Sequence, residues 1–378
     1  MYEPFSLIEA RGTHRELGRQ HGEQCRDRLL GFLDYLGSTL KLASAEIESR
    51  ATRFRPLFEQ HCPHLVDEIR GLAEGAAVRF EQALAVQIRG ELGQVERGGC
   101  TTFVIAARGT AAGNILIGQN CDMDPEMEQF GYVLRLEPHG KPSMILWTFG
   151  GQIGYHGINS AGIGHFANAL GGGPAWRFGL PHYPIKRMML ELRSLSGVFE
   201  LLRRSPVCSS GNYVLCDGDG RIADVELTPE GFEVIEDGGD GFITHTNHYL
   251  CGAHACPANY EQSVGDSFPR LDRIRELVSS KFGSITVDDL RGFLADHSGF
   301  PTGICRHPHD GPDHVSVSAR GRTVASLIAE PATGRFHVCR GNPCESTFAT
   351  YQLSSDNSAF GTRAAATSPS TGIIAASR

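Results

Sequence analysis

The strongest candidate for a reactive residue in this sequence is Cys100, which follows Gly98-Gly99 and opens the run CTTFVIAA. A glycine has no Cβ, so the peptide before the cysteine can adopt a strained conformation. The thiol could then attack the preceding carbonyl, move the acyl group from nitrogen to sulfur and let water release the upstream chain. We therefore predict self-cleavage between Gly99 and Cys100. The alternative from local sequence is a turn followed by a small buried cysteine.

Cleavage at this bond would place a thiol and an α-amine on one residue. Their ordinary pKa values are close, about 7.7–8.0 for the amine and about 8.5 for the thiol, so the amine could act as the general base for its own thiol at neutral pH. Nucleophile and base would then come from Cys100 alone, and no separate histidine would be needed.

Two polar motifs could complete such a site. GQNCDMDP (118–125) supplies Asn120 and Asp122 after a strand that should pair with the Cys100 strand, and HTNHY (245–249) supplies Asn247. An asparagine amide suits the negative charge that develops on a carbonyl oxygen, and a carboxylate could orient an amine. Taken singly, Asp122 could equally form an Asx-turn and Asn247 could cap a loop.

The elements around these motifs indicate an α+β fold. Residues 14–95 have helical spacing of apolar residues, with Pro63, Gly71 and Gly75 as potential breaks, whereas short β-rich runs separated by turns begin at Cys100. Further helical stretches follow at 184–204, 268–282 and 287–297, and strands return over 323–341. This order favours layers around a mostly antiparallel sheet core.

Composition limits the class of protein. The 378 residues are 40% hydrophobic and 21% charged, which is typical of a globular chain. The net charge of -8, with acids and bases interleaved, argues against a nucleic-acid partner. No apolar stretch is long enough to span a membrane, no signal peptide is recognisable, and the eleven cysteines form no framework, so we expect a cytoplasmic protein with reduced thiols.

Five motifs together resemble one family. GCTT (99–102), GQNCD (118–122), GINSAGIGHFANAL (157–170), GNYVLCDGDGRIADVE (211–226) and HTNHY (245–249) are similar to motifs of the acyl-coenzyme A:6-aminopenicillanic-acid acyltransferase (isopenicillin-N acyltransferase) family of N-terminal-nucleophile hydrolases. They occur in family order within roughly residues 10–340, and ELGRQHGE (16–23) adds weaker support.

The resemblance implies a fold and a set of roles. The fold would be a four-layer αββα sandwich with two antiparallel sheets, with 1–99 as a helical small subunit and 100–352 as the catalytic portion. The small and polar residues of 353–378 separately predict a disordered tail. Cys100 would be the nucleophile, Asp122 an active-site carboxylate and Asn247 part of the oxyanion hole. An arginine near the C-terminal strands would also belong to the site, either Arg320 or Arg322.

Further candidates lie beside these residues. GINSAGIGHFANALGGGPAW predicts a hairpin at 159–162 and then a loop at the pocket edge, with His165 and Asn168 facing the cleft unless they show ordinary strand polarity. Trp176 and Phe178 could line an acyl or aromatic pocket. Cys121 replaces the family's usual aromatic residue and places a second thiol near the first. Other substrate or oxyanion contacts could come from Thr101, Thr102, Asn120 and His245.

The chain also contains potential metal ligands. They are His245, His248, Cys251, His254 and Cys256 in one stretch and His307, His309 and His314 in another. Their spacing fits no common zinc pattern, so we expect no metal and no cofactor.

The sequence therefore predicts a self-processing cysteine amidohydrolase that acts on the C–N bond of a small acylated amine or amino acid, with its cleaved N-terminal fragment as partner. One alternative is transfer of an acyl group from acyl-coenzyme A to a small amine or β-lactam nucleus. Another is a zinc-binding or inactive binding protein of the same fold. We favour hydrolysis because no coenzyme A motif is apparent, which leaves water as the default acceptor.

Overall fold

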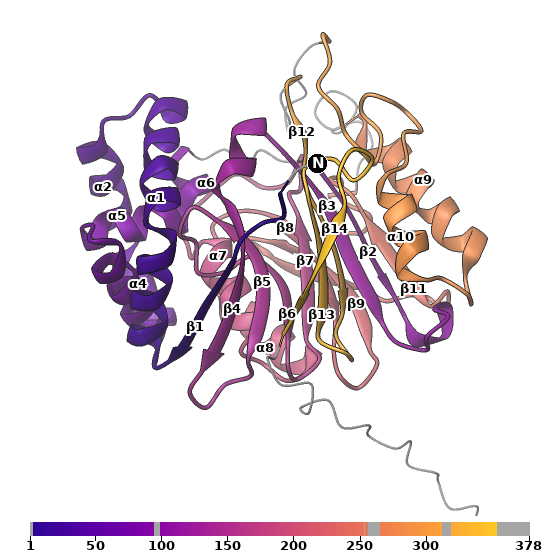
Figure 1. Ribbon diagram of the computed structural model, residues 1–378, viewed down its shortest axis with the longest axis horizontal. Helices are drawn as coiled ribbons and strands as arrows, with labels where there is room; N and C mark the ends of the chain where they lie inside the picture. The colour runs from indigo at the N-terminus through magenta and orange to yellow at the C-terminus, as the bar shows by residue number, and fades with distance from the viewer. Residues whose placement is uncertain (1–2, 94–98, 253, 256–264, 312–318, 354–378) are drawn as a thin grey trace, which may run out of the picture.

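Two β-sheets lie face to face between layers of helices (Figure 1). The computed structural model describes residues 3–93, 99–252, 254–255, 265–311 and 319–353. The αββα sandwich that the sequence predicts is confirmed by this arrangement. The predicted tail at 353–378 falls almost entirely outside the described residues.

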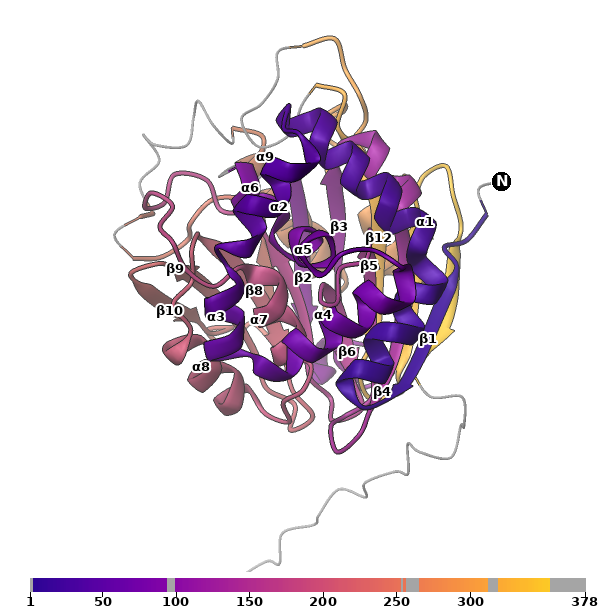
Figure 2. The same ribbon diagram turned by 90° about the vertical axis from the view of Figure 1, so that its left-hand side faces the viewer.

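The larger sheet carries the outer helices of the N-terminal segment. In spatial order its strands are β1 (Leu7–Gly12), β4 (Gly131–Pro138), β5 (Met144–Phe149), β6 (His156–Asn159), β7 (Gly164–Asn168), β8 (Gly211–Cys216), β9 (Ile222–Thr228) and β10 (Gly231–Ile235). The helices on this side of the molecule are α1 (His14–Leu40), α2 (Ser44–Thr52), α3 (Arg55–His61), α4 (Pro63–Ala76), α5 (Phe80–Ala85), α6 (Arg89–Gly93), α7 (His182–Met189) and α8 (Leu195–Arg204) (Figure 2).

The smaller sheet carries Cys100. Its spatial order is β11 (Phe242–His245), β2 (Gly99–Ile105), β3 (Leu116–Met123), β12 (Arg322–Glu330), β13 (Arg335–Arg340) and β14 (Phe348–Gln352). Helices α9 (Ser267–Lys281) and α10 (Val287–Leu294) cover its outer face (Figure 1). Short 3₁₀ turns are η1 (Val86–Ile88), η2 (Ala107–Gly109) and η3 (Pro125–Phe130). No helix of the described ranges is both long and apolar enough to cross a membrane.

The first strand corrects two predictions. Residues 1–99 are not wholly helical, because β1 forms the edge of the larger sheet, and that sheet is not wholly antiparallel, because β1 pairs with β4 in parallel. Ile8, Ala10 and Gly12 are buried while Glu9 and Arg11 are exposed, which is the alternation of an edge strand with one buried face. The run is short enough to be overlooked beside the long helix that follows it.

The glycines of α4 are also not breaks. Helix α4 continues through Gly71 and Gly75, and a Cβ at these positions would lie 2.1 Å from the Arg15 carbonyl oxygen and 1.9 Å from the Arg19 carbonyl oxygen. Both oxygens belong to α1, in which Gly18 and Gly22 meet the α4 backbone in the same way. These four glycines let the two helix backbones touch, and that contact holds the N-terminal layer together.

Gly71→Ala should therefore separate α1 from α4. We expect the free energy of unfolding to fall by about 1–3 kcal/mol, the usual cost of overpacking. Gly292→Ala in α10 is the matched control, since a Cβ there meets nothing within 4 Å, and a helical alanine should be up to about 1 kcal/mol more favourable. Thermal unfolding of both variants checks this. Equal midpoints would mean that the helix contact adapts without cost.

The predicted hairpin at 159–162 is confirmed. Strands β6 and β7 pair antiparallel, Gly162 has a φ of +90°, and the Asn159 Oδ1 atom accepts from the Ala161 and Ile163 N–H groups at 2.9 and 3.0 Å. The Asn159 amide also donates to the Leu190 carbonyl at 2.9 Å, which ties the turn to the end of α7.

Candidate active site

Cys100 is the second residue of β2, and its thiol faces the space between the two sheets. Cys100 pairs directly with Cys121 on β3, so their side chains share one face of the smaller sheet. The Cys121 Sγ atom lies 3.8 Å from the His156 Nδ1 atom of β6, which belongs to the opposite sheet. The second thiol that the sequence predicts near Cys100 is therefore present on the same face.

The main chain of Cys100 is held on both sides. Its N–H donates to the Asn247 Oδ1 atom at 3.1 Å, and its carbonyl accepts from the Arg270 Nη1 atom at 2.6 Å. The Arg270 Nη2 atom also donates to Asn247 Oδ1 at 2.7 Å. One asparagine and one arginine therefore hold the peptide groups on either side of the Cys100 Cα atom.

Burial makes the Cys100 thiol a weak acid in the uncleaved chain. The residue is 4% exposed, and burial raises the pKa of the thiol to about 12, with the Asp122 carboxylate adding to the rise. At neutral pH this thiol is protonated and needs a base to become a nucleophile.

Asp122 lies on the other face of the sheet. It pairs with Gly99, so its side chain points away from the cysteine thiols and towards the helical layer. There the Thr323 hydroxyl donates to Asp122 Oδ1 at 2.7 Å, and the Arg306 Nε atom is 3.5 Å from Oδ2. Burial raises the pKa of the Asp122 carboxyl, although the charge of Arg306 opposes this effect. In the uncleaved chain the Asp122 carboxylate therefore contacts Thr323 and Arg306, and its predicted role in orienting an amine stays a prediction.

Two buried arginines were missed by sequence reasoning. Arg306 forms ion pairs with Asp122 and with Asp266, and Arg270 lies 3.5 Å from Asp266 through its Nε atom. All four side chains are buried. Arg270 belongs to a helix rich in charged residues, so nothing in the local pattern separates it from the solvated arginines beside it.

Asn247 follows β11 and is in contact with Cys100, as its predicted role requires. The atom that faces the Cys100 nitrogen is the acceptor Oδ1, whereas the Nδ2 atom donates to the Ala169 carbonyl at 3.0 Å. Ala169 lines the cavity next to the thiol. The amide nitrogen of Asn247 therefore contacts a residue of the cavity lining.

A cavity of about 60 Å³ lies beside Cys100, between the sheets and α7. Tyrosines and cations are prominent in its lining, which consists of Arg89, Gly90, Cys100, Met123, Tyr155, Ala167, Asn168, Ala169, His182, Tyr183, Lys186, Gly211, Asn212 and Tyr213. The Lys186 Nζ atom is 3.5 Å from His156 Nε2 and 4.5 Å from the Tyr155 ring centroid. Such a lining suits a small polar substrate with an anionic group.

Asn168, Thr102 and His245 form one buried network at the cavity edge. The Asn168 amide donates to the Thr102 hydroxyl at 2.9 Å and to Asn212 Oδ1 at 3.1 Å, and it lies 3.5 Å from His245 Nδ1. The His245 Nε2 atom is 2.9 Å from the Glu226 carboxylate. Burial alone would lower the pKa of His245, but Asp224 and Glu226 raise it.

Several predicted contacts lie elsewhere. His165 faces α7, where its Nε2 atom is 3.0 Å from the Lys186 carbonyl, so it does not face the cleft as expected. Asn120 donates to the Leu294 and Ile304 carbonyls at 2.8 Å and serves the helical layer. The Thr101 hydroxyl accepts from Arg270 at 3.1 Å on the same face. Asn120 and Thr101 therefore contact the helical layer over the smaller sheet, and His165 contacts α7 over the larger sheet.

The two C-terminal arginines are also outside the cavity lining. The Arg320 side chain is 74% exposed and pairs with Glu126, while Arg322 lies within 4.0 Å of Glu128 and Glu345. Neither arginine therefore lines the cavity beside Cys100, and Arg306 is the arginine in contact with Asp122.

The expected aromatic pocket is separate from the Cys100 cavity. Trp176 and Phe178 line a groove of about 550 Å³ with Phe54 and with the arginines Arg50, Arg53 and Arg177. Residues Gly90 and Glu91 are consecutive in α6, and they line the cavity and the groove respectively. The two spaces are therefore neighbours along the chain.

The described histidines and cysteines of each rich stretch do not form a metal site with their neighbours in the same stretch alone. His248 Nδ1 is 2.7 Å from the Ser267 hydroxyl, and the Cys251 thiol donates to Glu226 at 3.1 Å. His307 instead meets His297 and two cysteines. Cys256 and His314 lie outside the described residues.

The two-sheet sandwich holds a buried cysteine beside a polar cavity, an arrangement that could act on an amide bond. Residues 110–345 match the model of the acyl-coenzyme A:6-aminopenicillanic acid acyl-transferase family, and the chain belongs to this family. A relative from Emericella nidulans, the acyl-coenzyme A:6-aminopenicillanic-acid-acyltransferase 40 kDa form, is 26% identical over 89% of this chain and 92% of its own length. The resemblance seen in the sequence is confirmed.

Two solved structures are similar in outline. A mutant of the conjugated bile acid hydrolase from Clostridium perfringens has a TM-score of 0.45 at 12% identity, over 66% of this chain and 96% of its own. Penicillin V acylase from Agrobacterium tumefaciens has a TM-score of 0.43 at 12% identity, over 64% of this chain and 82% of its own.

Proposed function

We propose that the protein is a self-processing cysteine amidohydrolase whose nucleophile is Cys100. The observation that carries this proposal is the placement of two atoms of Cys100, its sulfur and its main-chain nitrogen. The thiol faces the cavity, and the nitrogen is held by Asn247 Oδ1 at 3.1 Å. A residue that serves as both nucleophile and base needs this double placement.

Processing would begin with attack of the Cys100 sulfur on the Gly99 carbonyl carbon. The C–N bond then breaks, the nitrogen takes a proton and becomes an amine, and the acyl group is held as a thioester. Water cleaves the thioester and releases the Gly99 carboxylate. The new amine remains within reach of Asn247 Oδ1, which can accept one of its hydrogens and direct its lone pair towards the sulfur.

Turnover would use the same atoms. The amine accepts the thiol proton, and the sulfur attacks the carbonyl carbon of the substrate amide. The Asn247 amide donates to the oxyanion, and the proton passes from the Cys100 amine to the leaving amine. Water then hydrolyses the thioacyl group and restores the thiol. Asp122 and Arg306 would act as positioning residues behind the peptide, since their contacts lie on the opposite face.

The N-terminal fragment, residues 1–99, would stay bound after cleavage. Strand β1 pairs with β4 over its whole length. The Gln87 side chain donates to the Gly151 carbonyl and accepts from the Ile153 N–H, each at 3.0 Å. The buried Arg187 of α7 binds Glu68 of α4 at 3.1 Å. These non-covalent contacts would hold the small and large subunits together as a heterodimer.

The cavity lining supports one class of substrate. Arg89 and Lys186 are cations beside the thiol, and Tyr155 and Tyr183 supply flat surfaces. A small N-acyl amine with a carboxylate, such as an N-acyl amino acid, fits this chemistry because the anion would be paired on binding. The intact mass of purified protein and its hydrolysis of a panel of N-acyl amino acids test the proposal. One uncut chain with no amide turnover would contradict it.

Acyl-coenzyme A is a second candidate for the acyl donor. It is favoured by the family's activity and by the groove that holds Arg50, Arg53 and Arg177 beside Trp176. Arginines suit phosphate groups, and an aromatic ring can stack on adenine. An Arg53→Gln variant should raise KM for an acyl-coenzyme A several-fold and leave amide hydrolysis unchanged. Equal KM values for an acyl-coenzyme A in the variant and the unmodified protein would exclude binding of this donor in the groove.

A further inference from the structure

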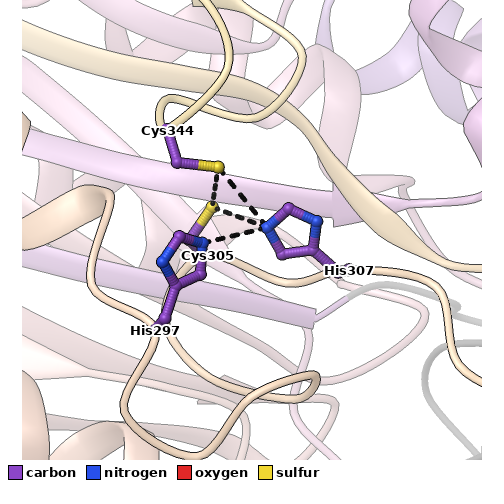
Figure 3. Close-up of side chains that lie close together, drawn as sticks. All are labelled: His297, Cys305, His307 and Cys344. Carbon is purple, nitrogen blue, oxygen red and sulfur yellow. Dashed lines mark hydrogen bonds between the residues drawn. The ribbon is translucent and has the colours of Figure 1, made fainter.

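Four side chains that the proposed chemistry does not use lie close together around the segment that contains Arg306. They are His297, Cys305, His307 and Cys344 (Figure 3). The first three belong to the segment after α10, and Cys344 lies between β13 and β14. Their potential ligand atoms all lie within 4.8 Å of one another, although 36 residues separate His307 from Cys344 in the sequence.

Four of the six distances between these atoms are close to those of a tetrahedral metal site, and the other two are within 4.8 Å. The two Sγ atoms of Cys305 and Cys344 are 3.5 Å apart, and His307 Nε2 lies 3.5 and 3.4 Å from them. The Nε2 atoms of His297 and His307 are 3.1 Å apart. With Zn–S near 2.3 Å and Zn–N near 2.0–2.1 Å, neighbouring ligand atoms of tetrahedral zinc are roughly 3.3–3.8 Å apart. One ion could therefore contact all four with small adjustments.

The groups around the cluster suit bound thiolate and imidazole. The Asn342 amide donates to Cys305 Sγ at 3.3 Å and to the Arg306 carbonyl at 2.6 Å. The other nitrogen of His307, Nδ1, is 3.7 Å from a Glu345 carboxylate oxygen. A carboxylate behind a histidine ligand and an N–H donor to a sulfur ligand are the outer contacts that metal sites use to orient their ligands.

We propose that His297, Cys305, His307 and Cys344 bind one Zn²⁺ as a closed structural site. On binding, both thiols lose their protons to solvent, and the two histidines coordinate through neutral nitrogens. Four protein ligands leave no position for water, so the ion would not take part in turnover.

The role of the ion would be to fix the segment that carries Arg306. Arg306 stands between two of the ligands in sequence, and its side chain reaches Asp122 and Asp266 behind the Cys100 peptide. Its main chain is held by Asn342 and by the Thr323 hydroxyl, which accepts from the Arg306 N–H at 3.0 Å. A metal ion bound to Cys305 and His307 would join this segment to Cys344, which lies between β13 and β14.

The test uses the full chain purified under reducing conditions from cells supplied with zinc. We expect one zinc ion per chain by elemental analysis. After the zinc is removed by chelation, added Co²⁺ should produce the visible bands of tetrahedral cobalt and the near-ultraviolet band of thiolate ligation. Cys344→Ser should lose the stoichiometric zinc and the thiolate band of the native site. Cys251→Ser is the matched control and should retain both, because Cys251 lies with Glu226 and not in this cluster.

These readouts do not depend on turnover, so they stand apart from the cysteine mechanism. Absence of stoichiometric zinc or tetrahedral cobalt in the unmodified protein would overturn the proposal. Loss of metal in Cys251→Ser together with its retention in Cys344→Ser would move the site to the other histidine-rich stretch. A Cys305–Cys344 disulfide, detected by peptide mapping of alkylated protein that had been kept reduced, would also overturn it.

Discussion

Cys100→Ala should yield a single folded chain of the full 41.0 kDa that has no amide-hydrolysing activity. In the proposed mechanism the sulfur is the nucleophile for both self-cleavage and turnover, so its removal should stop both reactions. The fold should persist because the main-chain contacts of Cys100 with Asn247 and Arg270 do not involve the side chain. Intact mass, a denaturing gel and circular dichroism measure the three parts of this prediction.

Cys121→Ala is the matched control. Its thiol is buried on the same face and pairs directly with Cys100, so the loss of volume and polarity is nearly the same. This variant should be cut into two fragments, the larger beginning Cys-Thr-Thr, and should remain active. Normal cleavage of Cys100→Ala would mean that the scissile bond lies elsewhere. An uncut Cys121→Ala would transfer the nucleophilic role to the other thiol.

The position of the site could be predicted from sequence because local signals are strong there. The Gly98-Gly99 pair predicts an interruption of the helical pattern, and CTTFVI that follows is rich in β-branched and aromatic residues, which favour a strand. The pairing of this strand with the GQNCD strand and the placement of Asn247 at its start both agree with the structure. The strand pairing depends on a short antiparallel connection, whereas Asn247 is 147 residues from Cys100 and is assigned to the site from the HTNHY motif and the family resemblance.

The face on which each side chain lies could not be predicted. A change of one residue in strand register moves a side chain to the opposite face. Because Cys100 pairs with Cys121, Asp122 pairs with Gly99 and points to the helical layer. The same rule separates Asn168, at the cavity, from His165, under α7. Nothing in the motif itself specifies this register.

The buried arginines show a second limit. Arg270 and Arg306 belong to charged stretches that would ordinarily be exposed, and they are buried because Asp122 and Asp266 converge on them from distant parts of the chain. Burial of such groups is tolerated when each charge is paired. The pairing is a property of the tertiary structure, so a pattern within one segment cannot reveal it.

Asn247→Ala should lower kcat by about 10²–10³ with little change in KM, the usual effect of removing an oxyanion donor. The amide nitrogen of Asn247 is bonded to Ala169 at the cavity edge, which is the side from which a substrate carbonyl would approach. Single-turnover kinetics with a chromogenic amide measure the acylation step directly. If Asn247→Ala also slows self-cleavage, the rate of self-cleavage gives a second measure of attack by the Cys100 sulfur on a carbonyl carbon.

Asn247→Asp separates the two atoms of this amide. The carboxylate keeps an oxygen that can accept from the Cys100 nitrogen and from Arg270, but it has no N–H for an oxyanion. We expect this variant to lose as much of kcat as Asn247→Ala, because its negative charge would oppose the charge that develops on the substrate oxygen. If Asn247→Asp instead regains most of the activity, the acceptor that orients the amine is the essential atom and the oxyanion donor must be sought among the main-chain N–H groups. A change confined to KM in both variants would make Asn247 a binding residue.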